Sequence, residues 1–222
     1  YGEYYSLILF STIGMMLMAS AADLIVLYLG LELMALSTYI LAGFIKHETR
    51  SNEAALKYML LGAFSSAFLL YGISMVYGLT GTTDIKTIAA IISERGLEGN
   101  SAILLSIMLL TVAFGFKIAA APFHMWLPDV YDGAPTAVTL YLAAAPKVAG
   151  LAVLIRLLVE GLGPMLSDWQ PMLVVISVLS LLVGNLIAIA QTSFKRMLTY
   201  STISHVGFIL LGLLAGTHEG YG

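Results

Sequence analysis

Long apolar runs separated by short polar segments dominate this chain. Seven runs reach the 17–25 residues that a helix needs to cross the hydrocarbon core of a bilayer. They cover residues 6–22, 24–45, 54–79, 101–121, 135–159, 171–191 and 200–216. None alternates strictly between apolar and polar positions, and only helices or closed barrels can span lipid. The pattern therefore predicts an all-α protein, a polytopic transmembrane helix bundle with about seven spans.

Two of the connections carry structure of their own. Within residues 80–100, Asp84 is a good N-cap for a short helix that has Ile85, Ile88 and Ile92 on one face. We expect this helix to lie on the membrane surface. Residues 121–134, together with Pro135, hold three prolines among aromatic and apolar residues. That composition predicts a proline-broken helix at membrane depth, which is tolerated where it lines a polar cavity.

Lysine and arginine in the connections predict the orientation. With alternating spans, one side receives Lys46, Arg50, Lys195 and Arg196, and the other receives Lys86, Arg95 and Arg156. The excess of positive charge places the first group in the cytoplasm. We interpret Lys195 and Arg196 as ordinary interfacial anchors.

Composition agrees with a lipid environment and excludes several classes of function. Of 222 residues, 59% are hydrophobic and 10% are charged, whereas a soluble domain carries about 25% charged residues. The net charge of −3 is too weak to imply a nucleic-acid partner, and the absence of cysteine excludes disulfides and thiolate metal sites. His124, Asp129 and Asp132 fit no metal-binding spacing and instead predict a water-lined mouth. No signal peptide is visible before the first run, and because Tyr1 is not a methionine we expect a piece of a longer protein.

Four ionisable residues interrupt the apolar runs: Glu32, Lys57, Lys117 and Lys147. A charge at mid-bilayer costs roughly 2.5–3.5 kcal/mol on insertion scales, so four of them indicate a path for charge, most plausibly protons. A buried lysine near a carboxylate can exchange a proton near neutral pH without a metal or an organic cofactor.

Each of the four also has a structural alternative. Glu32 could be a protonated, hydrogen-bonded structural carboxyl rather than an acid that exchanges protons with a lysine on another helix. Lys57 could extend to the interface, although it is the nearest candidate partner for Glu32. A helix rising 1.5 Å per residue puts Glu32 ~20 Å from the loop joining the two helices, so a direct bond needs a long reach, a tilt or a water. Lys117 could lie near an ordinary helix end. Lys147, in mid-run beside Pro146, cannot reach water.

Two histidines are secondary candidates. His124 lies in the proline-rich stretch and His205 in the last run. Either could extend a proton relay, and His205 could equally be a neutral histidine that packs within the bundle.

Three segments resemble the antiporter-like membrane subunits of respiratory complex I, NADH:quinone oxidoreductase. They are residues 115–136 (GFKIAAAPFHMWLPDVYDGAPT), 195–207 (KRMLTYSTISHVG) and 50–58 (RSNEAALKY). Residues 145–147, Ala-Pro-Lys, resemble the subunit N branch, because sister subunits and cation/proton antiporter subunits more often have a leucine pair before this lysine.

The resemblance implies two inverted five-helix repeats, each with one broken helix. Residues 6–159 would form the first repeat and residues 171–216 the start of the second. The second broken helix, with its own lysine, would lie beyond Gly222. By the same resemblance Glu32 is the central glutamate, Lys57 is its modulating partner, and two lysines, Lys117 and Lys147, carry protons.

The expected function is proton translocation in a bacterial inner (plasma) membrane, coupled to quinone reduction elsewhere in the complex. The expected partners are other membrane subunits of complex I and the lipid bilayer. No cofactor is expected in this chain, whereas quinone, flavin and iron–sulfur clusters are expected in partner subunits. Two alternatives remain. One is a subunit of a multisubunit cation/proton antiporter, and the other is a structural membrane module whose buried charges only fix helix packing.

Overall fold

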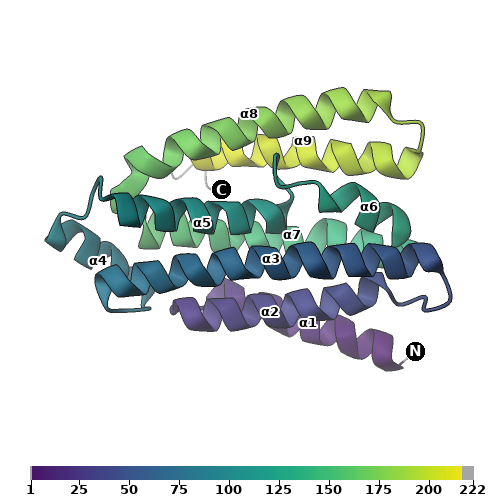
Figure 1. The fold of residues 1–222 in the computed structure, drawn as a ribbon, viewed down its shortest axis with the longest axis horizontal. Coiled ribbons are helices and arrows are strands. Elements are labelled where there is room, and N and C mark those ends of the chain that lie inside the picture. The colour runs from purple at the N-terminus through teal and green to yellow at the C-terminus, as the bar shows by residue number, and fades with distance from the viewer. Residues whose placement is uncertain (1, 217–222) are drawn as a thin grey trace.

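The computed structural model describes residues 2–216, which form an antiparallel array of long helices and no β-sheet (Figure 1). The α-helices are α1 (Gly2–Ser20), α2 (Leu24–Ala42), α3 (Thr49–Thr80), α4 (Ile85–Arg95), α5 (Ser101–Ile118), α6 (Trp126–Gly133), α7 (Thr136–Arg156), α8 (Leu166–Ala190) and α9 (Phe194–Leu214). A π-helical turn, η1 (Leu157–Gly161), and a 3-10 turn, η2 (Gly163–Met165), join α7 to α8. The predicted all-α bundle is confirmed.

Six helices are long and apolar enough to cross a membrane: α2, α3, α5, α7 with η1, η2 with α8, and α9. The remaining predicted span, residues 6–22, corresponds to α1, which packs along α2 but does not reach the same hydropathy. Its first turn contains Glu3 and two tyrosines, which lower the hydropathy of a 19-residue helix. The division into a first repeat and the start of a second stays a prediction, and residue 1 and residues 217–222 of the predicted single domain lie outside the described residues.

Close backbone contact holds α1 against α2. A Cβ atom added at Gly14 would lie 2.5 Å from the backbone nitrogen of Met34, and one added at Gly30 would lie 2.6 Å from that of Met18. Small residues allow transmembrane backbones to approach in this way, which increases the dispersion contacts between the helices.

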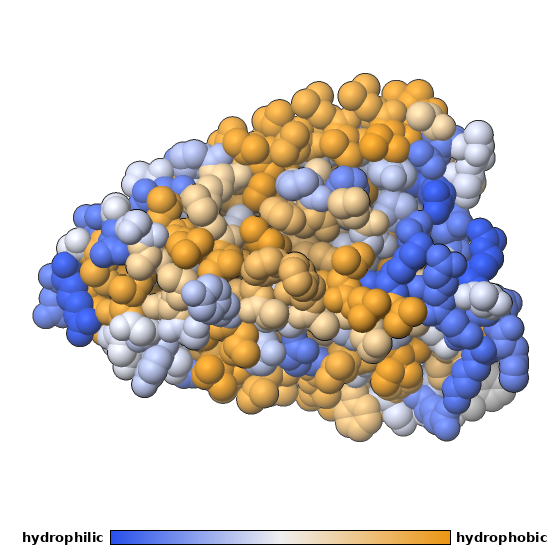
Figure 2. Space-filling model, viewed as in Figure 1, coloured by the Kyte–Doolittle hydropathy of each residue, from blue (hydrophilic) through white to orange (hydrophobic). Residues whose placement is uncertain are grey.

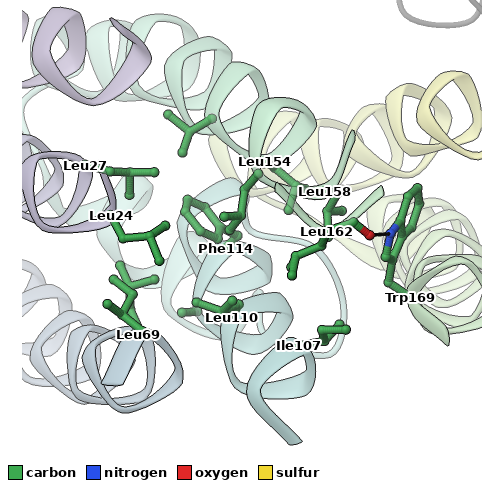
Figure 3. Packing of buried hydrophobic residues seen from close by; sticks show 14 of the residues in the cluster. Leu24, Leu27, Leu69, Ile107, Leu110, Phe114, Leu154, Leu158, Leu162 and Trp169 are labelled. Atoms are coloured by element: carbon green, nitrogen blue, oxygen red, sulfur yellow. Dashed lines mark hydrogen bonds between the residues drawn. The ribbon is translucent and has the colours of Figure 1, made fainter. Parts of the chain in front are cut away.

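A continuous apolar core joins the helices (Figure 3). Leu24 and Leu27 of α2 face Leu69 of α3, and Phe114 of α5 packs among them. Toward α8, the indole Nε1 of Trp169 donates a hydrogen bond of 3.0 Å to the carbonyl of Leu162, so the polar atom of this buried ring is satisfied.

The outer face has an apolar middle and two hydrophilic ends (Figure 2). The α2–α3 loop, α6 and the α8–α9 loop lie toward one end in Figure 1, and α4 lies at the other. The two predicted sets of cationic residues fall on these opposite ends, because Arg50 and Arg196 both contact α6, whereas Arg95 donates to the Leu79 carbonyl beside α4.

Several boundaries differ from those predicted. Helix α3 begins at Thr49 and α9 at Phe194, so both start about one turn or more before the apolar run. In α9 the hydroxyl of Ser193 accepts from the backbone nitrogen of Arg196, a cap that hydropathy does not reveal.

The predicted short helix is present as α4, but its isoleucine face does not meet lipid. Ile85, Ile88 and Ile92 are at most 2% exposed and belong to the main core, with η1 and η2 packed against α4. The end of the bundle itself covers these side chains, and the position of α4 at the membrane surface stays a prediction.

Candidate functional site

A helix break places Lys117 in the interior. Helix α5 ends at Ile118, and Ala119 adopts a left-handed conformation with φ 61°. The Ala120 backbone nitrogen then donates to the Gly115 carbonyl at 2.8 Å, which closes the helix end in a Schellman-type arrangement. The break predicted near this lysine is present, but it begins three residues before Pro122.

The broken segment is attached to α8. The backbone nitrogen of Ala121 donates to the hydroxyl of Ser180 at 2.9 Å, and Ser180 is fully buried. The chain then turns and forms α6, and Trp126 at its start donates from Nε1 to the Phe116 carbonyl at 2.8 Å. The first bond satisfies a backbone N–H that the break would otherwise leave unpaired, and the second gives the Phe116 carbonyl a partner besides the Ala119 backbone nitrogen.

Lys117 is 8% exposed and lies in the last turn of α5. Its Nζ donates to the hydroxyl of Tyr39 on α2 at 3.3 Å. No carboxylate within residues 2–216 forms an ion pair with Lys117 at 4 Å or less.

Lys147 lies in the middle of α7, one residue after Pro146, and is 5% exposed. Its Nζ is fully buried and has no hydrogen-bond partner in the described part of the chain. The ring of Tyr131 on α6 faces it, with 5.4 Å between Nζ and the ring centroid. The sequence prediction that this lysine cannot reach the surface agrees with that burial.

Glu32 lies in the middle of α2 and is half-buried. The hydroxyl of Ser66 on α3 donates to its Oε1. The predicted lysine partner is not in contact, because Lys57 bonds elsewhere. A seryl hydroxyl was not expected, since serine in a long apolar run gives no signal of its own in hydropathy.

Lys57 lies at a hydrophilic end of the bundle, and its Nζ is 2.8 Å from Asp129 on α6 and 2.8 Å from Glu53 on its own helix. Its side chain is 42% exposed. Lys57 and Glu32 therefore form no direct bond, and the Lys57 side chain extends toward the interface. The role of Lys57 as a modulating partner of Glu32 stays a prediction. Physically, Glu32 lies too far along its helix from the shared loop for the two groups to meet.

Asp129 and Asp132, predicted to form a water-lined mouth, anchor an ion-pair network at a hydrophilic end of the bundle. Arg196 of α9 contacts Asp129 at 2.8 Å, and Arg50 of α3 contacts Asp132 at 3.0 Å. The network surrounds a polar cavity of about 180 Å³. Lys195, interpreted as a simple anchor, donates at 2.9 Å to the Ala134 carbonyl just past α6. Sequence reasoning missed these pairings because the partners come from three helices far apart in the chain.

The two histidines do not join the lysines. His124 is half-buried beside Tyr200, with 6.3 Å between ring centroids, and its Nδ1 has no partner among residues 2–216. His205 is exposed on α9, so within the described residues it does not pack into the bundle. No group of three or more His, Asp or Glu side chains suited to a metal ion occurs in the described part.

The family model for NADH:quinone oxidoreductase/Mrp antiporter transmembrane proteins matches residues 21–222. The chain belongs to this family. NADH-quinone oxidoreductase subunit N of Thioalkalivibrio sulfidiphilus is 56% identical over 99% of the chain and 46% of that protein. Subunit N of Alkalilimnicola ehrlichii is 54% identical over 99% of the chain and 45% of that protein. The chain thus spans about half the length of the curated relatives that it matches.

Solved structures of other proteins share the fold of this chain. A chain of respiratory complex I from Thermus thermophilus matches with a TM-score of 0.83 and 38% identity, covering 98% of this chain and 46% of the other. A chain of the Mrp complex from Dietzia sp. matches with a TM-score of 0.82 and 25% identity, covering 94% and 38%. The fold is therefore common to both branches, and the higher sequence identity lies with complex I.

Proposed function

We propose that this chain is part of a proton-translocating membrane subunit of NADH:quinone oxidoreductase. The observation that carries the proposal is the burial of two lysines that form no ion pair within residues 2–216, Lys117 beside a helix break and Lys147 in mid-helix. Such charges are costly in a membrane interior and mark ion or proton pathways. The high identity to subunit N relatives supports the same assignment.

In this proposal protonation changes pass from the Glu32 region to Lys117 and then to Lys147. Reduction of quinone in partner subunits would change the electric field or hydration near Glu32, which the Ser66 hydroxyl holds in place. The chain would carry no redox group itself. It would reside in a bacterial inner membrane among other membrane subunits of the complex, and flavin and iron–sulfur clusters would be bound by partner subunits.

The test is Lys147→Met in the intact complex, with protons translocated per electron as the readout. Methionine fills a similar apolar volume, so assembly should be retained while the titratable group is lost. We expect a lower ratio. An unchanged ratio in a fully assembled complex would show that Lys147 carries no protons and would overturn the proposal.

A second candidate function is that of a cation/proton antiporter subunit, because the Mrp chain has nearly the same TM-score as the complex I chain. Sodium-dependent proton flux in vesicles that lack any redox partner would favour this candidate. Flux that depends on quinone reduction and not on sodium would favour the first.

A further inference from the structure

Four buried aromatic side chains form a continuous contact path between the two lysines. Tyr39 of α2 meets Tyr58 of α3 edge to face, with 4.7 Å between centroids. Tyr58 stacks on Trp126 of α6 at 4.5 Å and 5°, and Trp126 meets Tyr131 edge on at 6.3 Å. All four are at most 5% exposed. We call Tyr39, Tyr58, Trp126 and Tyr131 the aromatic bridge.

The two ends of the aromatic bridge meet their lysines differently. Lys117 Nζ is 3.3 Å from the Tyr39 hydroxyl but 5.7 Å from the ring centroid, so the hydroxyl faces the ammonium. Lys147 Nζ is 5.4 Å from the Tyr131 centroid and makes no hydrogen bond with its hydroxyl, so the ring faces this ammonium. One tyrosine therefore offers a lone pair and the other offers the negative face of its ring.

A ring face stabilises a cation most strongly where water is excluded. Lys147 has no ion pair at 4 Å or less within residues 2–216, so the Tyr131 ring is the group that the structure places against its ammonium. The bridge is also fixed to the α5 break, because Trp126 Nε1 donates to the carbonyl of Phe116, the neighbour of Lys117. A displacement of the Lys117 turn would consequently move the ring system that supports Lys147.

We infer that the aromatic bridge positions both lysines for proton transfer, Tyr39 through its hydroxyl and Tyr131 through its ring. The inference rests on the proposed function and adds to it two positioning residues and a mechanical link between the lysines. The hydroxyl of Tyr131 has no partner within the described residues and takes no part.

Tyr39→Phe, Tyr131→Phe and Tyr131→Leu in the intact complex test this inference through protons translocated per electron. Tyr39→Phe removes the bond to Lys117, and Tyr131→Leu removes the ring over Lys147. Each should lower the ratio of protons translocated per electron toward the value of Lys147→Met. Tyr131→Phe keeps the ring and should leave the ratio unchanged.

Tyr141→Leu is the matched control. Tyr141 lies on α7 with Lys147, is half-buried and bonds through its hydroxyl to Ser11 at 3.0 Å, outside the aromatic bridge. The Tyr141→Leu complex should translocate the same number of protons per electron as the unmodified complex. If the Tyr131→Leu complex does not assemble, the two phenylalanine variants still decide. The inference expects fewer protons translocated per electron in Tyr39→Phe than in Tyr131→Phe, and an equal or higher ratio in Tyr39→Phe would overturn it.

The outcomes also separate the inference from the proposed function. A normal ratio in Lys147→Met would overturn both. A low ratio in Lys147→Met with normal ratios in Tyr39→Phe and Tyr131→Leu would overturn the inference alone. Equal losses in Tyr131→Leu and Tyr141→Leu, with both phenylalanine variants normal, would indicate a packing role and contradict it as well.

Discussion

At the scale of single residues, Asp129 is a hub between helices. Its two carboxylate oxygens contact Lys57 of α3 and Arg196 of α9, each at 2.8 Å. The three side chains are 38–42% exposed, so solvent screens and weakens each ion pair.

We predict that Asp129→Asn lowers stability by only about 1 kcal/mol while loosening the first turn of α9 from α6. Faster amide hydrogen exchange at the start of α9 would show this. Glu53→Gln is the control, because Glu53 pairs with Lys57 within α3 alone and should leave α9 unaffected. Equal exchange in both variants would contradict the hub role.

Asp23 caps α2 outside the membrane-spanning segments. A hydrogen bond from the Thr83 hydroxyl, together with bonds from the backbone nitrogens of Ile25 and Val26, holds the pKa of Asp23 below its ordinary value of 3.8. Because the folded-state pKa is lower than that of the unfolded chain, the stabilisation is present above pH ~3.9 and is lost as the pH falls through the folded-state pKa.

Asp23→Ala should therefore cost about 1 kcal/mol at neutral pH, the usual loss for an N-cap. Asn at the same position keeps the acceptor without the charge, so it should retain most of the stability and remove this acid-dependent step. Thermal unfolding of the detergent-solubilised protein across acidic to neutral pH measures both. An identical pH dependence in Asp23→Asn and the unmodified chain would refute the assignment.

At the scale of elements, close packing of α1 on α2 depends on two glycines. We predict that Gly30→Val separates these helices and costs several kcal/mol, since the first added carbon would already lie 2.6 Å from the Met18 backbone nitrogen. Gly78→Ala on α3 is the control, because a Cβ there meets nothing within 4 Å. Melting temperatures compare the two, and a Gly30→Val variant as stable as Gly78→Ala would contradict the packing described.

Hydropathy predicted the existence of the long helices better than their ends. The first turns of α3 and α9 contain charged residues that hydropathy assigns to loops. Because Ser193 caps α9, Lys195 and Arg196 lie within the helix. The sequence predicts the α5 break near Pro122, yet the helix ends earlier, at Ile118, because local backbone bonds at Ala119 and Ala120 and the Ser180 hydroxyl of α8 close the break.

At the scale of the whole molecule, burial of the two lysines was predictable and their surroundings were not. Lys147 in mid-run has no route to water, and the proline-rich segment after Lys117 predicts a helix break at membrane depth, so burial was expected for both. Their contacts with Tyr39 and Tyr131 come from helices distant in sequence, and tyrosines in apolar runs carry no distinguishing pattern. The same reason explains why the contact between Glu32 and Ser66 could not be predicted.

The charges of the molecule are thus of two kinds. Ion pairs gather at the hydrophilic end that holds Asp129 and Asp132, where solvent weakens them. The interior lysines have hydroxyl or ring contacts instead of carboxylate partners at bonding distance within the described residues. That separation is what a proton path needs, because a tightly paired lysine would not release its proton.

The most direct test compares buried and exposed lysines in one experiment. Protons translocated per electron should be measured in the intact complex carrying Lys117→Met, Lys147→Met or Lys46→Met, the last at an exposed loop position. The account predicts a lower ratio for the two interior variants and an unchanged ratio for Lys46→Met. Three ratios equal to that of the unmodified complex would contradict it.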